Sequence, residues 1–345
     1  MLRICLFSVT FILLATPEWA QQASAEGPYK VLKTAKVGGD GGWDYVSADV
    51  EGRRLYIART GPTPRMTVYN LDTLEPVGEI ATGNAHGAAI DPKSSHGFIT
   101  SKPLVMFDTK TLTAIKTIDV RGNPDGHLFD PFNQRAYILS HVAPHVTVID
   151  TKDGSLAGTL DIGGMPEQAA TDGNGHLYID VEDKANIAVV DTKTLTVTAH
   201  YDVTGKGGTC AGLALDVKNR ILFAACRNPA TMVILNADDG NIIATLPIGA
   251  GSDGAGFNPK TMEAFSSQGD GTLTIIKEKS PTSFEVEQTL QTMVGARTST
   301  LDTKTNRIIL IAAEFGPPTP PAQPGGRPGR GALVPGSFTI LVVGK

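Results

Sequence analysis

Six ionisable side chains recur at one position of an internal repeat, where they could bind ions or polar molecules. The position lies five residues before an aspartate or asparagine that ends a short strand-like run, and it holds Asp44, His86, Asp125, Glu167, Ala211, Asp253 and Arg297. Carboxylates that come close together oppose one another's ionisation unless a cation or a proton lies between them. The set therefore predicts a polar site, provided that the fold brings the repeats together.

A divalent metal ion is one ligand that this set could hold. His86, Asp125 and Glu167 belong to three consecutive repeats. Their oxygen ligands favour calcium or magnesium, and the histidine also admits transition ions such as manganese, iron or zinc. The alternative is a hydrated polar surface without an ion, and both interpretations predict a pocket.

Arg297 and an aromatic pair add to the same site. If the repeats close into a ring, Arg297 falls between Asp253 and Asp44, and we expect it to neutralise both. Trp43 and Tyr45 flank Asp44, where they could form an aromatic wall for a sugar or a ring. The alternative for both is packing between repeats.

Further histidines lie in the same region of the sequence: His127, and His141 with His145 in the SHVAPH segment. With His86 they could form a transition-metal cluster. No pair has the tight spacing of a known metal motif, and exposed loop histidines are the alternative. Neighbouring loops also carry charges of both signs, including Arg227 and Glu182, which suits a polar small molecule or a peptide.

The repeat itself determines how these residues are placed. The residues that end each strand-like run are spaced by 42, 39, 42, 44, 42 and 44, and they are Asp49, Asp91, Asp130, Asp172, Asp216, Asn258 and Asp302. A turn, a second strand such as LYIA, a third rich in β-branched residues and an alternating fourth follow. The last unit lacks its fourth strand, which Val31–Val37 can supply. The pattern predicts an all-β, seven-bladed β-propeller with four antiparallel strands per blade, closed by its N-terminal strand.

The recurring x-P-x-x-A-x-D-x-x-x-x-x-L-Y-I-A and V-x-V-I-D-T-K-T-L segments resemble the YVTN-type β-propeller repeat family of secreted and surface-layer proteins. The resemblance covers residues 29–345 and implies a WD40-like propeller fold. Similar propellers serve as binding scaffolds, adhesion modules and enzymes, so the resemblance implies no single activity.

The N-terminus resembles an export signal. Arg3, the apolar run Ile4–Ala15 and the small residues Ala23 and Ala25 form the pattern of a cleaved signal peptide over residues 1–25. An uncleaved anchor is the alternative, but the run is shorter than the roughly 20 residues that span a bilayer. We expect a single propeller domain over residues 26–345 that is periplasmic or secreted and not an integral membrane protein. The net charge of −5 shows no basic patch for nucleic acid.

Two cysteines and one long loop also bear on the predicted structure. Cys210 and Cys226 flank a predicted hairpin, and an oxidising compartment permits a disulfide between them; two buried thiols are the alternative. Residues 316–337 are rich in proline and glycine and interrupt the last blade as a long loop on the same face as the polar site.

The sequence contains no G-x-S-x-G elbow, no phosphate-binding loop and no C-x-x-C-H haem motif. The leading hypothesis is an exported protein that binds a small polar molecule or a protein partner at the channel mouth. The alternatives are a metal-assisted enzyme, such as a lactonase-like hydrolase with Asp44 or Asp253 as base, and a structural module of the cell envelope.

Overall fold

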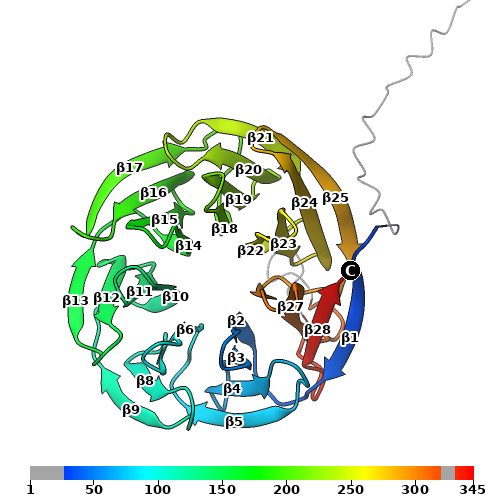
Figure 1. The fold of residues 1–345 in the computed structure, drawn as a ribbon. Coiled ribbons are helices and arrows are strands. Elements are labelled where there is room, and N and C mark those ends of the chain that lie inside the picture. Colours follow the sequence, from blue (N-terminus) through cyan, green and yellow to red (C-terminus); the bar gives the residue numbers. More distant parts are fainter. Residues whose placement is uncertain (1–26, 320–330) are drawn as a thin grey trace, which may run out of the picture.

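Seven four-stranded antiparallel sheets stand like blades around a central channel in the computed structural model, which describes residues 27–319 and 331–345 (Figure 1). The predicted seven-bladed propeller is confirmed, with every sheet formed in the expected order. The expected signal peptide and residues 320–330 of the long loop lie outside the described residues. No helix in the part of the chain that the structure describes is long and apolar enough to cross a membrane.

Six blades run from the channel outward in chain order, and the last blade takes β1 as its outer strand. The first strands are β2 (Trp43–Asp49), β6 (Ala88–Asp91), β10 (Pro124–Asp130), β14 (Pro166–Thr171), β18 (Cys210–Asp216), β22 (Ser252–Asn258) and β26 (Ser299–Asp302). The second strands are β3 (Arg54–Arg59), β7 (His96–Ile99), β11 (Arg135–Ser140), β15 (His176–Val181), β19 (Ile221–Arg227), β23 (Glu263–Gln268) and β27 (Arg307–Ala312). The third strands are β4 (Arg65–Asn70), β8 (Leu104–Asp108), β12 (Val146–Asp150), β16 (Asn186–Asp191), β20 (Ala230–Asn236), β24 (Thr272–Ser280) and β28 (Thr339–Gly344). The outer strands are β5 (Pro76–Ala81), β9 (Ala114–Ile118), β13 (Leu156–Leu160), β17 (Thr196–Asp202), β21 (Ile242–Pro247), β25 (Ser283–Gln291) and β1 (Lys30–Lys36).

The repeated aspartate or asparagine closes the turn after each first strand. In all seven blades its side chain accepts a hydrogen bond of 2.8–3.1 Å from a backbone NH two or three residues later. Such side-chain turns explain why these residue types recur at this point. Some also join neighbouring blades: Thr151 of blade 3 donates to Asp91 of blade 2, and Thr171 of blade 4 donates to Asp130 of blade 3. The same residues therefore hold both the turn and the spacing of the blades.

Apolar side chains of the inner three strands fill the space between adjacent blades. Tyr56 of blade 1 and Phe107 of blade 2, for example, are both fully buried, with ring centroids 5.6 Å apart. Blade sheets packed face to face in this way share one core with each neighbour. The ring thus fixes the position of each first strand relative to the channel.

The N-terminal strand completes the last blade, as expected. β1 pairs antiparallel with β28, with Lys30 opposite Gly344 and Lys36 opposite Thr339. Just before β1, the backbone of Tyr29 exchanges two hydrogen bonds, of 2.8 and 2.9 Å, with the side chain of Gln288 in blade 6. The closing strand is therefore held by two blades.

Candidate functional site

The predicted ring residues gather at one mouth of the channel because the first strands are irregular there. In five blades the pairing between the first and second strands shifts around the ring residue, at Trp43/Val46, Pro124/His127, Pro166/Ala169, Cys210/Gly212 and Ser252/Gly254. Bulges of this kind bend a strand and re-aim its side chains. In the other two blades, His86 and Arg297 lie just before β6 and β26. The ring residues are thus directed toward one another.

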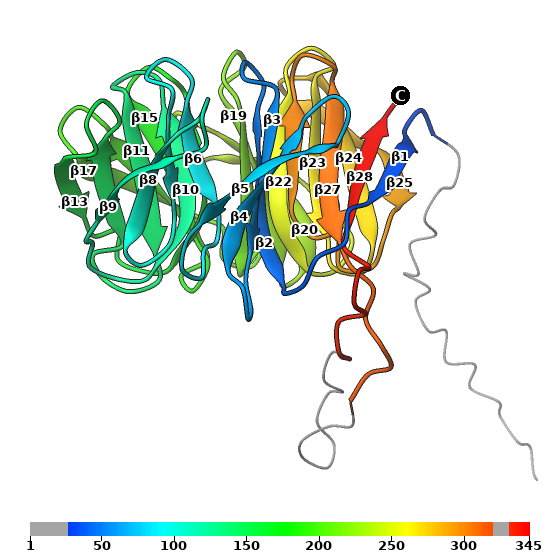
Figure 2. The same cartoon turned by 90° about the horizontal axis from the view of Figure 1, so that it is seen from below.

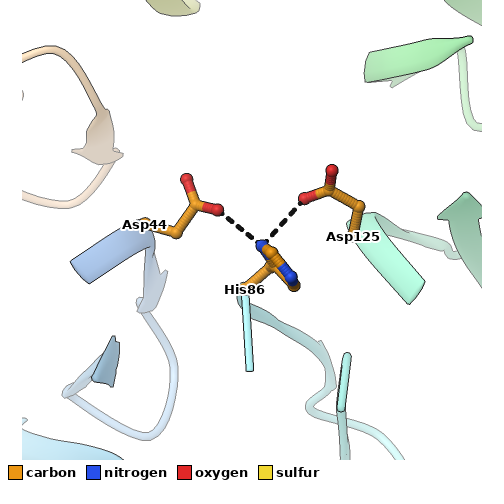
Figure 3. A group of neighbouring side chains, drawn as sticks. All are labelled: Asp44, His86 and Asp125. Carbon is orange, nitrogen blue, oxygen red and sulfur yellow. Dashed lines mark hydrogen bonds and ion pairs between the residues drawn. The ribbon is translucent and has the colours of Figure 1, made fainter. Parts of the chain in front are cut away.

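Asp44, His86 and Asp125, from blades 1 to 3, form one end of a continuous polar arc (Figure 3). Nδ1 of His86 lies 2.7 Å from Oδ2 of Asp44 and 3.1 Å from Oδ1 of Asp125. The hydrogen bond that His86 donates to Asp44 raises the pKa of His86, and the negative charge of Asp125 adds to this against the opposing effect of burial. These three residues meet as the sequence predicted.

His141 extends this arc to Glu167 of blade 4. Its Nε2 lies 3.4 Å from Oδ2 of Asp125 and 3.0 Å from Oε2 of Glu167. The Tyr45 hydroxyl donates a 3.1 Å hydrogen bond to the other oxygen of Glu167, Oε1. The side chains of Asp125 and Glu167 are only 14% and 12% exposed, so these charges interact in a partly desolvated setting. The five residues Asp44, His86, Asp125, His141 and Glu167 are called the acid–histidine arc below.

Burial and hydrogen bonding shift proton affinities along this arc. Burial raises the pKa of Asp125 to about 6, despite the lowering effect of the nearby histidines. The hydrogen bond to Glu167 raises the pKa of His141 to about 9. In the absence of another cation, the histidines of the arc thus favour their protonated forms, which lie between carboxylates.

Asp253 of blade 6 lies in a second group, with two arginines. Nε of Arg297 lies 2.7 Å from one oxygen of Asp253, and Arg227 pairs with the other oxygen. Arg227 also lies 3.3 Å from Glu182. Burial raises the pKa of Asp253 to about 6, and both arginines oppose that rise. Asp253, Arg227, Arg297 and Glu182 are called the arginine group below.

The expectation that Arg297 neutralises both Asp253 and Asp44 is only half fulfilled. Within residues 27–319 and 331–345, Arg297 makes no ion pair with Asp44. The carboxylate of Asp44 instead faces His86, and its carbonyl oxygen accepts a 2.8 Å hydrogen bond from Thr298. The nearer histidine therefore takes the place that the sequence assigned to the arginine.

Blade 5 contributes no charge from its first strand, because the ring position there is Ala211. Arg227, at the end of the paired strand β19, supplies the charge instead. The structure contains a disulfide between Cys210 and Cys226, the residues that immediately precede Ala211 and Arg227. This covalent link therefore fixes the strand ends from which Arg227 reaches Asp253.

Among residues 27–319 and 331–345, two groups of three side chains have the spacing of a metal site, and both include Asp125. One consists of Asp44, His86 and Asp125, and the other of Asp125, His141 and Glu167; in each, all ligand atoms lie within 4.8 Å of one another. The predicted trio of His86, Asp125 and Glu167 is thus divided between them.

The predicted four-histidine cluster does not form. Only His86 and His141 belong to the arc. His127 lies deeper, with Nε2 2.9 Å from Oγ of Ser47, and its burial lowers its pKa to about 4. His145 instead lies 2.5 Å from Asp161, an exposed residue. Neither of these two histidines can contribute to a shared metal site with the others.

An aromatic wall borders the arginine group. The ring of Trp43 lies 5.9 Å from Phe315 and 5.3 Å from Phe338, between centroids. Trp43, Phe315 and Leu333 line a cavity of about 340 Å³ together with Arg297 and two glycines. Phe315 and Leu333 also form an isolated β-bridge at the base of the long loop. Figure 2 shows residues 313–319 and 331–338, between β27 and β28, projecting from one face of the ring.

Below the arc, two side chains narrow the channel. Tyr45 hydrogen-bonds Glu167, and Gln168 of blade 4 accepts bonds of 3.0 Å from the backbone NH groups of Leu213 and Ala255. These residues line a further cavity of about 310 Å³ that contains His127. The arc, the arginine group and the cavity beside Trp43 are together called the cup below, and Tyr45 and Gln168 are called its floor.

Comparison with solved structures identifies the fold. The chain is similar to a structure described as "Crystal structure of RRP9 WD40 repeats", with a TM-score of 0.71 at 10% sequence identity, covering 94% of this chain and 99% of that one. It is also similar to "Structure of U3-55K", with a TM-score of 0.70 at 9% identity, covering 91% and 98%. No protein-family model and no curated protein matches the sequence. The similarity establishes a β-propeller with WD40-like architecture.

Proposed function

We propose that this chain is an exported binding protein that holds a small ligand in the cup at the channel mouth, and that the ligand carries an anionic group and a planar or apolar part. The observation that carries the proposal is the cavity in which Arg297 faces Trp43, Phe315 and Leu333. A guanidinium beside an aromatic wall is suited to a carboxylate attached to a ring or chain.

Arg297 has donors left for such a ligand. Its Nε is paired with Asp253, and within the described ranges its two terminal nitrogens donate no hydrogen bond to the protein. Its side chain is 38% exposed, so a ligand can reach it. Arg227 also neutralises Asp253, which reduces the competition for the charge of Arg297.

Titration with small carboxylates tests this function. We expect at least one of benzoate, indole-3-acetate and gluconate to bind the full chain in calorimetry, and Arg297→Gln to weaken that binding at least about tenfold, the loss typical of a charge-assisted hydrogen bond. Arg121→Gln, at an exposed arginine on another loop, is the matched control. The proposal fails if none of the three probes binds, or if both variants bind like the wild type.

A metal-assisted hydrolase is the second candidate, and the two three-residue groups in the acid–histidine arc favour it. A bound ion would polarise an ester or lactone carbonyl and lower the pKa of water. Asp253 is a poor candidate for the base, because two arginines occupy its oxygens. Lactone hydrolysis that depends on added metal and is lost on His86→Gln would support this candidate over simple binding.

Location and subtype form the last part of the proposal. The signal-like residues 1–25 support export to the periplasm or the exterior, and the repeat segments support the YVTN-type subfamily of propellers. Mass spectrometry of the N-terminus after expression in a bacterial host tests export, since cleavage is expected after Ala25. A mature chain that retains Met1 would count against it.

A further inference from the structure

We propose that the acid–histidine arc is a two-ion centre in which Asp125 bridges two divalent transition-metal ions. His86 and Asp44 would complete the first ion's protein ligands, and His141 and Glu167 those of the second. The inference goes beyond the binding of a small anion, because it concerns the acid–histidine arc of blades 1 to 4 and not Arg297 of blade 7.

The two oxygens of Asp125 face different histidines. Oδ1 lies 3.1 Å from Nδ1 of His86, whereas Oδ2 lies 3.4 Å from Nε2 of His141. Asp125 belongs to both groups of three potential ligands. A carboxylate placed in this way can give one oxygen to each of two ions. Asp125 can therefore bridge the two ions, and the two groups of ligands do not compete for it.

Each histidine presents a single nitrogen to two carboxylates. Nδ1 of His86 faces Asp44 at 2.7 Å and Asp125 at 3.1 Å, and Nε2 of His141 faces Glu167 at 3.0 Å and Asp125 at 3.4 Å. One N–H bond can be close to linear toward only one of two acceptors, and hydrogen bonds weaken steeply away from linearity. A metal ion in the same place binds the nitrogen and both oxygens together. The arrangement therefore suits a metal ion better than a proton.

The charges of the arc are consistent with two ions. Three carboxylates and two neutral imidazoles carry a charge of −3, and two divalent ions supply +4. The remaining positive charge would attract an anionic group from solvent or from a ligand. Imidazole ligands favour iron or zinc over calcium and magnesium, and the three carboxylates also suit manganese.

Neighbouring residues hold two of the outer ligands in place. The Tyr45 hydroxyl donates to Oε1 of Glu167, which leaves Oε2 facing His141. Thr298 of blade 7 donates to the backbone carbonyl of Asp44. Partners that orient metal ligands in this way are a regular part of metal sites. The five ligands come from three first strands and two loops held by the ring, which limits their movement.

Manganese titration tests the proposal. Mn(II) is added to the EDTA-treated full chain, and bound metal is measured by elemental analysis after dialysis and by electron paramagnetic resonance. We expect two ions per chain with a spin-coupled spectrum. His86→Gln and His141→Gln should each retain one ion with an uncoupled signal. Asp125→Asn should remove the coupling, and circular dichroism checks that each variant is folded. If Asp125→Asn does not fold, Asp44→Asn replaces it. Asp44→Asn alters the first group alone and should leave one uncoupled ion.

Two control variants keep the interpretation specific. His145→Gln changes a histidine outside the arc, and Asp253→Asn changes a carboxylate of the arginine group; both should still bind two coupled ions. The proposal is overturned if the wild type binds fewer than two ions, or if two ions bind without coupling. Carboxylate binding at Arg297 is measured separately on metal-free protein. Failure of the manganese titration therefore does not decide whether a carboxylate binds at Arg297.

Discussion

Arg53, in the first turn of blade 1, donates hydrogen bonds of 2.9 and 2.7 Å to the two oxygens of Asp302 in blade 7. The pair joins the blade that contains both chain ends to the blade that follows it. Burial alone would raise the pKa of Asp302, but the hydrogen bonds from Arg53 and Thr305 outweigh it and lower the pKa to about 2.

This pair should make stability depend on pH in the acid range. Asp302→Asn is expected to lower the free energy of unfolding at neutral pH by about 2 kcal/mol, the value of a downward shift of this size. Because the folded-state pKa is depressed, the contribution is complete above the unfolded value of about 3.9 and is lost as the pH falls through about 2. Urea unfolding at several pH values measures the difference between wild type and variant, which should shrink on acidification. Asp72→Asn, at the exposed partner of the same arginine, is the control and should have a smaller effect. A difference that stays constant with pH would contradict this account.

Gln168 should contribute to stability through the channel floor. Its side chain bonds the backbone of Leu213 in blade 5 and both backbone groups of Ala255 in blade 6. Gln168→Ala leaves these groups without that partner, and we expect a loss of about 2–3 kcal/mol in chemical denaturation. Gln134→Ala removes one exposed hydrogen bond to Pro131 and should change stability by less than about 0.5 kcal/mol. Equal losses of stability for the two substitutions would show that the hydrogen bonds of Gln168 in the channel contribute no more than one exposed hydrogen bond.

The disulfide should stabilise blade 5. Cys210 and Cys226 are 16 residues apart in sequence, and closing a loop of that size contributes about 3 kcal/mol. We expect a reducing agent to lower the urea midpoint of the wild type but not that of the double variant Cys210→Ala, Cys226→Ala. Because the bond fixes the end of the strand that carries Arg227, the double variant should also bind the carboxylate probes more weakly. An unchanged midpoint in the reduced wild type would exclude this role.

Removal of β1 should expose the edge of the last blade. Strand β28 is buried along its whole length, and without β1 its backbone would offer an unpaired apolar edge to other chains. A chain that begins at Gly38 is expected to form aggregates in size-exclusion chromatography and to melt at a lower temperature. Deletion of residues 1–26, which leaves β1 intact, is the control. Identical elution and melting of the two truncations would argue against ring closure as a source of stability.

The fold could be predicted from sequence because each repeat carries its own turn signal. Asp49, Asp91 and their equivalents mark the turn, and their regular spacing implies the same blade each time. The missing fourth strand could likewise be inferred, since one blade lacked a strand and one N-terminal segment lacked a partner. Both signals can be read directly from the sequence, because the first is a local turn pattern and the second is the number of strands in each repeat.

The contacts within the site were predicted less well, because they depend on side-chain reach and loop shape. The repeat indicated that Asp44, His86 and Asp125 meet, and His141 was expected near His86 as part of a four-histidine cluster. The sequence could not show that His141 would instead lie between Asp125 and Glu167. It could not show that Arg227 would compensate for the small side chain of Ala211. The expectation that His127 joins a metal cluster was wrong, because His127 follows Asp125 by two residues in β10 and lies deeper in the channel.

The register of β1 and β28 has a mechanical consequence. Lys30 lies opposite Gly344, so the first residue of the closing strand and the last residue of its partner are at the same end of the pair. A force that pulls these two ends apart would load the cross-strand bonds one after another, as in a zipper, and not all at once in shear. The ring should therefore open first at this seam under tension, while the other six blades, each formed from one continuous stretch of chain, stay intact.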